Sequence, residues 1–213
     1  MIGLDVTTSI APERFVQMRD TLIPQIVLAR LQPGDEVAWV PINANPEREL
    51  KLQRLTGKMG TDKGLRDMHA RLRQVEQSRD PKIINNLGSF LAYGKRTGTM
   101  LEAERQRLVS QGKKPVPVER LVFSLFTDGE LPAGQSVPPS GPWPTNVAVW
   151  IWGVESVYET RLKQWLTTDL ELPEGQVTLV RFSDWQLTEA KTFGARIGRP
   201  FADLGFLKRL RGV

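Results

Sequence analysis

The apolar residues of this chain fall into short runs that alternate with segments of helical periodicity. The runs are rich in β-branched and aromatic residues and lie between turn-forming residues, a pattern that predicts strands. They lie at 1–6, 36–42, 49–55, 120–126, 146–154 and 176–182. Between them, apolar residues recur every three or four positions, which predicts helices. These helices are expected at 12–29, 65–79, 82–93, 100–111, 158–170 and 184–198.

The alternation of strands and helices predicts an α/β fold of the Rossmann-like, three-layer type. Its sheet is expected to be open and mostly parallel, with helices on both faces. The run at 49–55 follows the preceding strand after a short turn, which predicts one antiparallel edge strand. Pro24 is expected to kink or break the first helix. The polar stretch at 94–99 contains two glycines and is expected to be a loop.

Two predicted strands end in unusually polar segments. Asp5–Ser9 follows the first strand, and Thr127–Glu130 follows the strand at 120–126. Ligands of open α/β sheets bind beyond the carboxyl ends of the strands, so these segments are the candidate functional site. Their carboxylates and hydroxyls are oxygen ligands of the kind that Mg²⁺ prefers. Hydroxyls are neutral, so a bound cation would keep positive charge with which to attract an external carboxylate.

The first segment resembles the Asp-x-Ser-x-Ser motif of von Willebrand factor type A domains, with Thr7 in place of the first serine. The second resembles the Thr-Asp-Gly strand end of the same family. Between them, Gly98 and Thr99, with Ala103 four residues later, are similar to the family's Gly-Thr helix start; Thr97 is an alternative to Thr99. The resemblance covers about residues 1–190, and the type of member that it implies is an intracellular bacterial one. It implies a vWA-like domain at 1–190, followed by a basic C-terminal tail at 191–213.

The resemblance also implies a function. A metal-ion-dependent adhesion site would bind Mg²⁺, or Mn²⁺ or Ca²⁺, and through it an acidic residue of a protein partner. Thr7, Ser9 and Thr99 would be direct ligands, whereas Asp5 and Asp128 would bind directly or through water. The family supplies no catalytic residue, so we expect an adaptor within a multi-protein assembly rather than an enzyme.

Composition narrows the possible functions further. The chain has no Cys and one His, which excludes disulfides, cysteine nucleophiles and sites that need two His ligands. The single His69 is expected at the surface or its boundary. Neither a secretory signal nor an apolar run of membrane-spanning length is present, so we expect a cytoplasmic protein with no membrane span.

The net charge of +5 lies entirely in the tail at 191–213, which has six basic residues and one acidic residue. Nucleic-acid-binding domains carry basic side chains along a whole face, interleaved with aromatics, so this distribution does not predict nucleic-acid binding. A solvated tail and a tail that binds an acidic partner both fit it. Trp143 in the proline-rich loop at 131–144 has two interpretations, an exposed contact residue or one that packs the loop onto the domain.

Two alternative functions remain. One is a metal-free scaffold of the same fold. The other is a metal-dependent phosphate-processing enzyme, because Ile2–Ser9 is similar to the first phosphate loop of actin-like ATPases. That loop needs glycine where Val6 and Thr7 stand, since backbone amides must approach phosphate closely. A Walker loop is absent, and a haloacid-dehalogenase-like phosphatase would need a second Asp at position 7.

Overall fold

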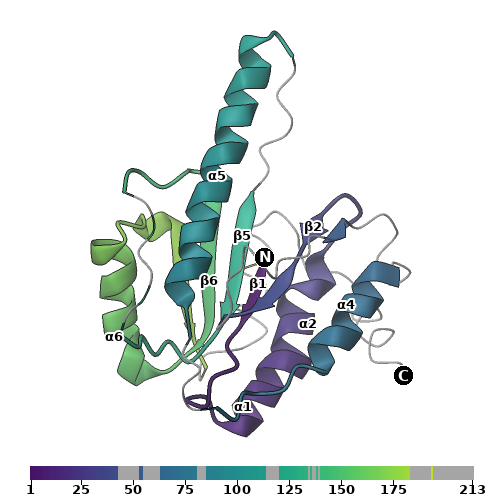
Figure 1. Cartoon of the computed structure of the whole chain (residues 1–213), viewed down its shortest axis with the longest axis vertical. Coiled ribbons are helices and arrows are strands. Elements are labelled where there is room, and N and C mark those ends of the chain that lie inside the picture. Colours follow the sequence, from purple (N-terminus) through teal and green to yellow (C-terminus); the bar gives the residue numbers. More distant parts are fainter. Residues whose placement is uncertain are drawn as a thin grey trace.

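A five-stranded parallel sheet forms the centre of the molecule (Figure 1). The computed structural model describes residues 1–42, 53–54, 63–80, 85–113, 120–133, 135, 138, 140–182 and 193. The strand order is β3-β1-β5-β6-β7, and every neighbouring pair is parallel. The strands are β1 (Ile2–Leu4), β3 (Trp39–Pro41), β5 (Leu121–Phe126), β6 (Val147–Val154) and β7 (Val177–Arg181). The expected α/β class is therefore confirmed.

The expected antiparallel strand does not lie at an edge of this sheet. Within the described residues, β4 (Gln53–Arg54) pairs antiparallel with β2 (Glu36–Val37), and these two form a separate small sheet. The predicted strand at 36–42 is interrupted at Ala38, so that β2 and β3 belong to different sheets. The two runs therefore do pair, but the expected place of this pairing in the fold is wrong. Of the predicted strand at 49–55, residues 49–52 and 55 lie outside the described residues.

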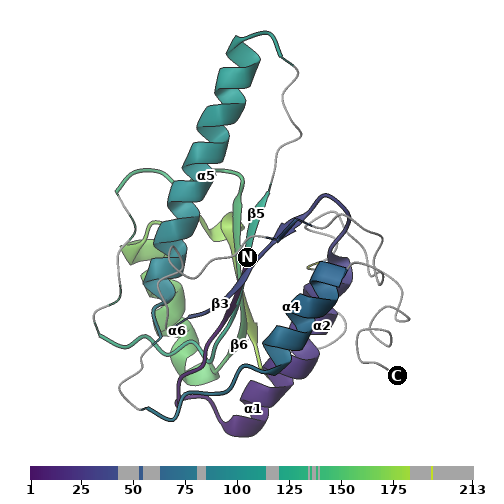
Figure 2. The same cartoon turned by 45° about the vertical axis from the view of Figure 1, so that its right-hand side comes forward.

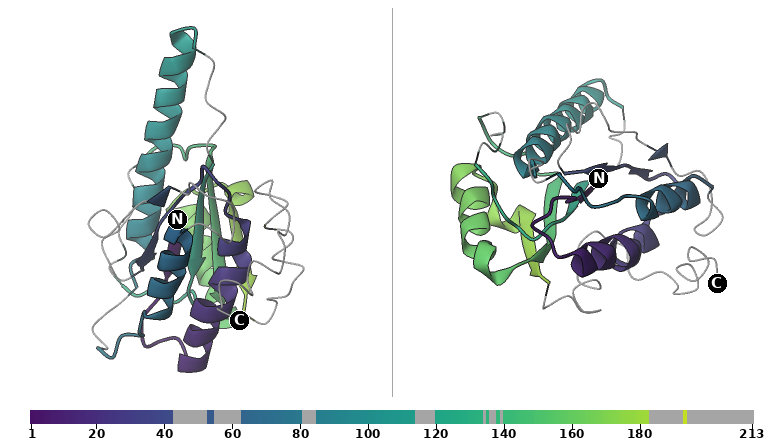
Figure 3. Two further views of the ribbon diagram at one scale, coloured as in Figure 1. Left: turned by 90° about the vertical axis from the view of Figure 1, so that its right-hand side faces the viewer. Right: turned by 60° about the horizontal axis from the view of Figure 1, so that its bottom comes forward.

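The helices on one face come from two parts of the chain, the segment after β1 and the segment after β4. They are α1 (Pro12–Gln17), a π-helical turn η1 (Met18–Leu22), α2 (Ile23–Ile26), a 3₁₀ turn η2 (Leu28–Arg30) and α4 (Lys63–Arg73). Pro24 lies in the first turn of α2, where its missing amide hydrogen is tolerated, and the chain changes from π-helical to α-helical form just before it without a gap in the helix. Figures 2 and 3 show α4 beside α1 and α2 on the same side of the sheet. Their buried side chains pack on Ile2, Leu4 and Trp152.

The opposite face is covered by α5 (Leu87–Ser110) and by α6 (Ser156–Gln164), which continues into a second π-helical turn, η3 (Trp165–Asp169). Phe90 and Leu91 of α5 and Leu162 of α6 pack on this face. The second half of α5 extends beyond the sheet (Figure 1), and most of residues 99–110 are exposed.

The expected loop at 94–99 and the separate helices on either side of it are wrong, because α5 runs through this stretch without a break. The two glycines serve packing. A Cβ atom on Gly94 would lie 2.6 Å from the Phe123 ring, and one on Gly98 would lie 2.5 Å from Val147 Cγ2. Glycine therefore lets the helix approach β5 and β6 closely. Glycines within a polar segment are also typical of loops, which is why the sequence predicts a loop here.

The burial of three further side chains bears on predictions made from the sequence. Trp143 is buried, and its Nε1 donates to the Leu170 carbonyl oxygen at 2.7 Å, so it packs the proline-rich loop onto the domain. His69 is 4% exposed, so its expected position at the surface or its boundary is wrong. Phe193 is buried against Trp150 and Trp152, although it falls within the expected tail.

The order of the strands reverses between β1 and β5. The chain leaves β1 for β3 on one side and later returns to β5 on the other side of β1. In open parallel sheets, such a switch point leaves a crevice at the carboxyl ends of the two strands. Asp5 and Asp128 follow β1 and β5, so the fold places both of them there. No helix of the described part of the chain is long and apolar enough to cross a membrane.

Candidate metal centre

The carboxyl ends of β1 and β5 bring the two polar segments together. The Asp5 amide donates to the Phe126 carbonyl oxygen at 2.8 Å, which continues the strand pairing to the edge of the sheet. Thr127 Oγ1 lies 2.7 Å from Asp5 Oδ2 and 3.4 Å from Asp128 Oδ1. Because both oxygens lie within reach of one hydroxyl, they are at most about 6 Å apart. The structure therefore brings together the two aspartates that the sequence singles out.

Asp5 is the buried base of the cluster, with no exposed surface. Its Oδ1 accepts hydrogen bonds from the Thr7 amide at 2.9 Å and from Thr7 Oγ1 at 2.7 Å. Its Oδ2 accepts from Thr127 Oγ1 and, at 3.3 Å, from Asn85 Nδ2. Four donors thus satisfy the carboxylate without water. This arrangement suits a residue that orients the surrounding hydroxyls rather than one that binds a cation directly.

Thr7 and Ser9 present a pair of hydroxyl oxygens above Asp5. Their oxygens lie 3.0 Å apart. The single proton of the Thr7 hydroxyl goes to Asp5, so Ser9 is the donor between the two. Thr7 is buried and Ser9 is exposed, so the pair leads from the interior to the surface. Both oxygens therefore retain lone pairs that can bind a cation.

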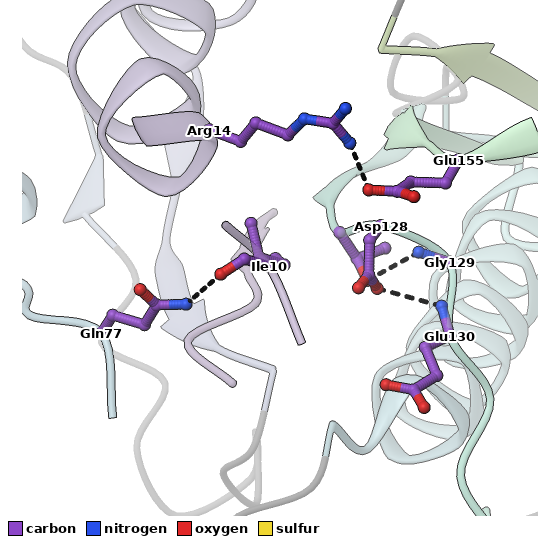
Figure 4. Close-up of polar contacts among 8 residues, drawn as sticks. Ile10, Arg14, Gln77, Asp128, Gly129, Glu130 and Glu155 are labelled. Carbon is purple, nitrogen blue, oxygen red and sulfur yellow. Dashed lines mark hydrogen bonds and ion pairs between the residues drawn. The ribbon is translucent and has the colours of Figure 1, made fainter. Parts of the chain in front are cut away.

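Asp128 completes the oxygen cluster from the side of β5. Its Oδ1 accepts from the Glu130 amide at 3.0 Å, while Gly129 N donates to Thr127 Oγ1 at 3.2 Å (Figure 4). The turn requires glycine, because residue 129 has a φ of +88°. No hydrogen bond of the described residues involves Asp128 Oδ2. That oxygen is therefore the carboxylate oxygen of the Asp5–Asp128 pair that could still take a cation, although Asp128 as a whole is buried.

Asn85 is a site residue that the sequence pattern did not single out. It lies just before α5, is 3% exposed, and donates from Nδ2 to Asp5 and, at 2.7 Å, to the Glu130 carbonyl oxygen. It thereby links the segments after β1 and β5. The sequence does contain a signal for a helix start at this position. Asn86 caps α5 by accepting from the Ser89 amide, and Asn before an apolar helical run marks a helix start.

Thr99 and its alternative Thr97 are not part of this cluster. Thr99 lies inside α5, is exposed, and donates its hydroxyl hydrogen to the Lys95 carbonyl oxygen at 2.9 Å. It is thirteen residues beyond the cap Asn86, or about 20 Å along a helix. Its neighbour Gly98 packs on Val147, at the amino end of β6. The structure therefore places both threonines toward the opposite end of the sheet from Asp5.

The rim of the centre carries charges of both signs. Arg14 of α1 forms an ion pair with Glu155, which follows β6 (Figure 4). The Glu155 amide donates to the Asp128 carbonyl oxygen at 2.8 Å, so this pair adjoins the centre. On the other side, Gln77 Nε2 donates to the carbonyl oxygens of Thr7 and Ile10. Gln77 thus holds the loop from Asp5 to Ile10 at two of its carbonyl oxygens.

Burial raises the pKa of Asp5 above its ordinary value of 3.8, and the nearby Asp128 carboxylate adds to the rise. Hydrogen bonds from Thr127 and Thr7 act in the opposite direction, because they stabilise the ionised form. Burial also raises the pKa of Tyr158, with further contributions from Glu130, Asp128 and Glu155. The electrostatic potential at the centre is therefore negative, and a bound cation would relieve the repulsion among its carboxylates.

The donor set consists of hydroxyls and one open carboxylate oxygen. Among the described residues, no group of three His, Cys, Asp or Glu side chains could hold a metal ion. A cation here would bind Thr7, Ser9 and Asp128, and would complete its coordination with water or with an external ligand. Such partial, all-oxygen coordination is typical of Mg²⁺. No family model, curated protein or solved structure matches this chain, so the centre is interpreted from its own geometry.

Proposed function

We propose that this chain is a vWA-like binding module that recognises an acidic residue of a protein partner through a divalent cation. The observation that carries the proposal is the pair of hydroxyls of Thr7 and Ser9, 3.0 Å apart and supported by the buried Asp5. Beside them, Asp128 has a free carboxylate oxygen. This combination supplies three oxygen ligands and leaves one side of a cation open.

Mg²⁺ is the cation that we propose, with Mn²⁺ and Ca²⁺ as substitutes. It keeps several water ligands and accepts oxygen donors of either charge. Two hydroxyls and one carboxylate neutralise only part of its charge. The remaining positive charge would favour an anionic ligand from outside, which in a protein partner is an Asp or Glu side chain. We infer an adaptor role without catalysis, in a cytoplasmic multi-protein assembly.

A metal-free scaffold is the second candidate, and one observation favours it. The four hydrogen bonds to Asp5 come from protein groups, so the centre is held together without a cation. Thr99, which the family resemblance implies as a ligand, lies elsewhere. On this alternative, the polar cluster stabilises the switch point of the sheet and the partner binds another surface.

Calorimetric titration with MgCl₂ and MnCl₂ distinguishes the two candidates. The wild-type protein is expected to bind one divalent cation. Asp128→Ala is expected to lower the affinity at least tenfold, about 1.4 kcal/mol, because it removes the free carboxylate oxygen. Asp67→Ala changes an exposed aspartate of α4 and is the matched control.

An Asp128→Ala protein that folds normally and binds the cation as tightly as the control would contradict the metal centre. Absence of cation binding by the wild-type protein would favour the metal-free scaffold. Capture of a tagged protein's partner in Mg²⁺ but not in chelator would support the binding function itself.

A further inference from the structure

Glu155 lies at the edge of the candidate metal centre but is not among its proposed ligands. Its amide donates to the Asp128 carbonyl oxygen at 2.8 Å, so the segment after β6 lies beside the segment after β5 as a neighbouring strand would. Neighbouring strands are about 4.8 Å apart. A glutamate side chain is about as long as this spacing, and its rotamers give the Glu155 carboxylate access to a cation held by Asp128.

Tyr158 provides separate evidence that the carboxylates of Asp128 and Glu155 lie near each other. The Tyr158 amide donates to the Glu155 carbonyl oxygen at 3.0 Å. On its other side, a Cβ atom on Gly129 would lie 3.6 Å from Tyr158 Cβ. Burial raises the pKa of Tyr158, with further contributions that include the charges of Asp128 and Glu155. One phenol hydroxyl is therefore within electrostatic range of both carboxylates.

Arg14 holds the Glu155 carboxylate in its present position. The two side chains form an ion pair, and the Glu155 carboxylate points toward Arg14 (Figure 4). The Arg14 guanidinium also lies 4.7 Å from the centroid of the Phe182 ring, a cation–π contact that helps to fix its position. The side chains of Arg14 and Glu155 are 39% and 35% exposed, so solvent and a partner protein both have access to the pair.

The position of Glu155 determines how much positive charge a bound cation keeps. With Asp128 as its one carboxylate ligand, a divalent cation keeps a net positive charge that favours an external acid. A second carboxylate ligand would balance the two positive charges and would occupy a coordination position with a protein group. The affinity for the cation would rise, because it depends on the number of charged ligands. The centre would then bind its cation more tightly and an external acid more weakly.

We propose, on the basis of the function inferred above, that Glu155 is a further ligand of the cation and competes with the acidic residue of the partner. The ion pair with Arg14 keeps Glu155 off the cation and so keeps the site open to the partner. Loss of this ion pair lets Glu155 bind the cation and closes the site.

Manganese binding tests the proposal without a known partner. Titration of the full chain with MnCl₂ gives the cation affinity, and the relaxation of water protons gives the number of waters on the bound Mn²⁺. Arg14→Gln cannot form the ion pair, so Glu155 is expected to replace a bound water and to raise the Mn²⁺ affinity about tenfold. Sodium acetate serves as the external carboxylate. It is expected to displace water from Mn²⁺ on the wild-type protein and to have little effect on Arg14→Gln.

A double-mutant cycle separates ligation by Glu155 from the loss of a positive charge. In a Glu155→Gln background, Arg14→Gln is expected to change the affinity only slightly and to leave the number of bound waters unchanged. Arg105→Gln removes a positive charge from the exposed second half of α5 and is the control outside the centre. Arg14→Met, which keeps a long side chain beside Phe182, is a second variant, and circular dichroism checks the fold of each protein.

The outcomes separate the two proposals. Wild-type affinity and water number in both Arg14 variants would overturn the role of Glu155 and leave the metal-dependent function standing. A gain in affinity that persists in the Glu155→Gln background would also overturn it, because charge alone would then account for the gain. Absence of Mn²⁺ binding by the wild-type protein would overturn both proposals.

Discussion

Asp5 shows how a buried charge can organise a site at the scale of single residues. Removal of a carboxylate from water is costly unless hydrogen bonds replace the lost solvation. Here two hydroxyls, one backbone amide and one side-chain amide do so. The carboxylate fixes the orientation of the Thr7 hydroxyl, and with it the direction in which its lone pairs point. Burial still raises the pKa of Asp5, so these hydrogen bonds offset only part of the cost of burying the carboxylate.

Asp5→Asn is expected to remove a pH dependence of the free energy of unfolding, measured in chelator. The pKa of Asp5 is higher in the folded protein than the ordinary 3.8, so the folded state binds the proton more tightly. The stabilisation from this proton is complete below about pH 4 and is lost as the pH rises through the folded-state pKa. For every tenfold by which folding tightens proton binding, this stabilisation amounts to about 1.4 kcal/mol.

Urea unfolding at a series of pH values measures this effect. The wild-type protein is expected to lose stability relative to Asp5→Asn as the pH rises through the window. Asp67→Asn, at an exposed position, should follow the wild type. Equal pH dependence in the Asp5→Asn and wild-type proteins would show that the carboxylate is as well solvated in the fold as in the unfolded chain.

Substitutions at Asn85 and at Thr99 are expected to differ in their effect on cation affinity. Asn85→Ala removes the donor that links Asp5 to the Glu130 carbonyl oxygen, so the affinity for Mn²⁺ is expected to fall about threefold to tenfold. Thr99→Ala removes only a hydroxyl on the exposed side of α5 and should leave the affinity unchanged. Calorimetric titration compares the two variants directly. A loss confined to Thr99→Ala would contradict the placement of the centre.

At the scale of elements, α5 shows why only part of the site can be predicted from the sequence. The strands β1 and β5 are predictable because their apolar runs are continuous, and Asp5 and Asp128 stand out because polar residues end those runs. From the sequence, two helices are predicted in place of α5, because Gly94, Gly98 and the polar residues between them have the composition of a loop. That division favours Thr99 as the third part of the site. The Asn86 cap marks the start of the helix beside Asn85, but only the tertiary contacts of the glycines reveal that the helix continues through residues 94–99.

The two packing glycines of α5 are expected to resist substitution. Gly94→Ala would place a methyl group 2.6 Å from the Phe123 ring, and Gly98→Ala would place one 2.5 Å from Val147. Each is expected to destabilise the protein by about 1–3 kcal/mol, although alanine favours the helix. Gly175→Ala is the control, because nothing lies within 4 Å of its added Cβ. Thermal or urea unfolding measures the difference. Stabilisation by Gly94→Ala would mean that α5 lies farther from the sheet.

At the scale of the whole molecule, two hydrophobic cores lie on the two faces of the sheet. Phe193 belongs to the core on the side of α1 and α2, where its ring packs edge-on against Trp150 and Trp152 at centroid distances of 4.9 and 5.6 Å. The Arg30 guanidinium lies 5.6 Å from the same ring centroid. Composition suggests a solvated tail after residue 190, because basic residues dominate there. Phe193 is one of three phenylalanines in that basic segment, which is a weak sequence signal for burial, yet it forms part of the core.

Phe193→Ala is therefore expected to destabilise the full chain by about 3 kcal/mol, the usual cost of truncating a buried phenylalanine. Because the ring contacts two tryptophans, near-ultraviolet circular dichroism should change as well. Val157→Ala truncates a side chain that is 73% exposed and serves as the control. If the Phe193 variant is as stable as the control, the segment does not contribute to the core.

The parallel order of the strands also has a consequence for how the protein is made. Strand β1 pairs with β5 in the register Ile2 to Ser124, so contacts at the centre of the sheet join residues roughly 120 positions apart. Sheets with such distant pairings fold slowly. During synthesis at about 5–20 residues per second, β1 leaves the ribosome several seconds before β5 exists. Asp5 is made well before Thr127, so the hydrogen bond between them forms only after all the residues that separate them have been added. A growing chain therefore exposes the apolar edge of β1 to chaperones and to other chains throughout that interval.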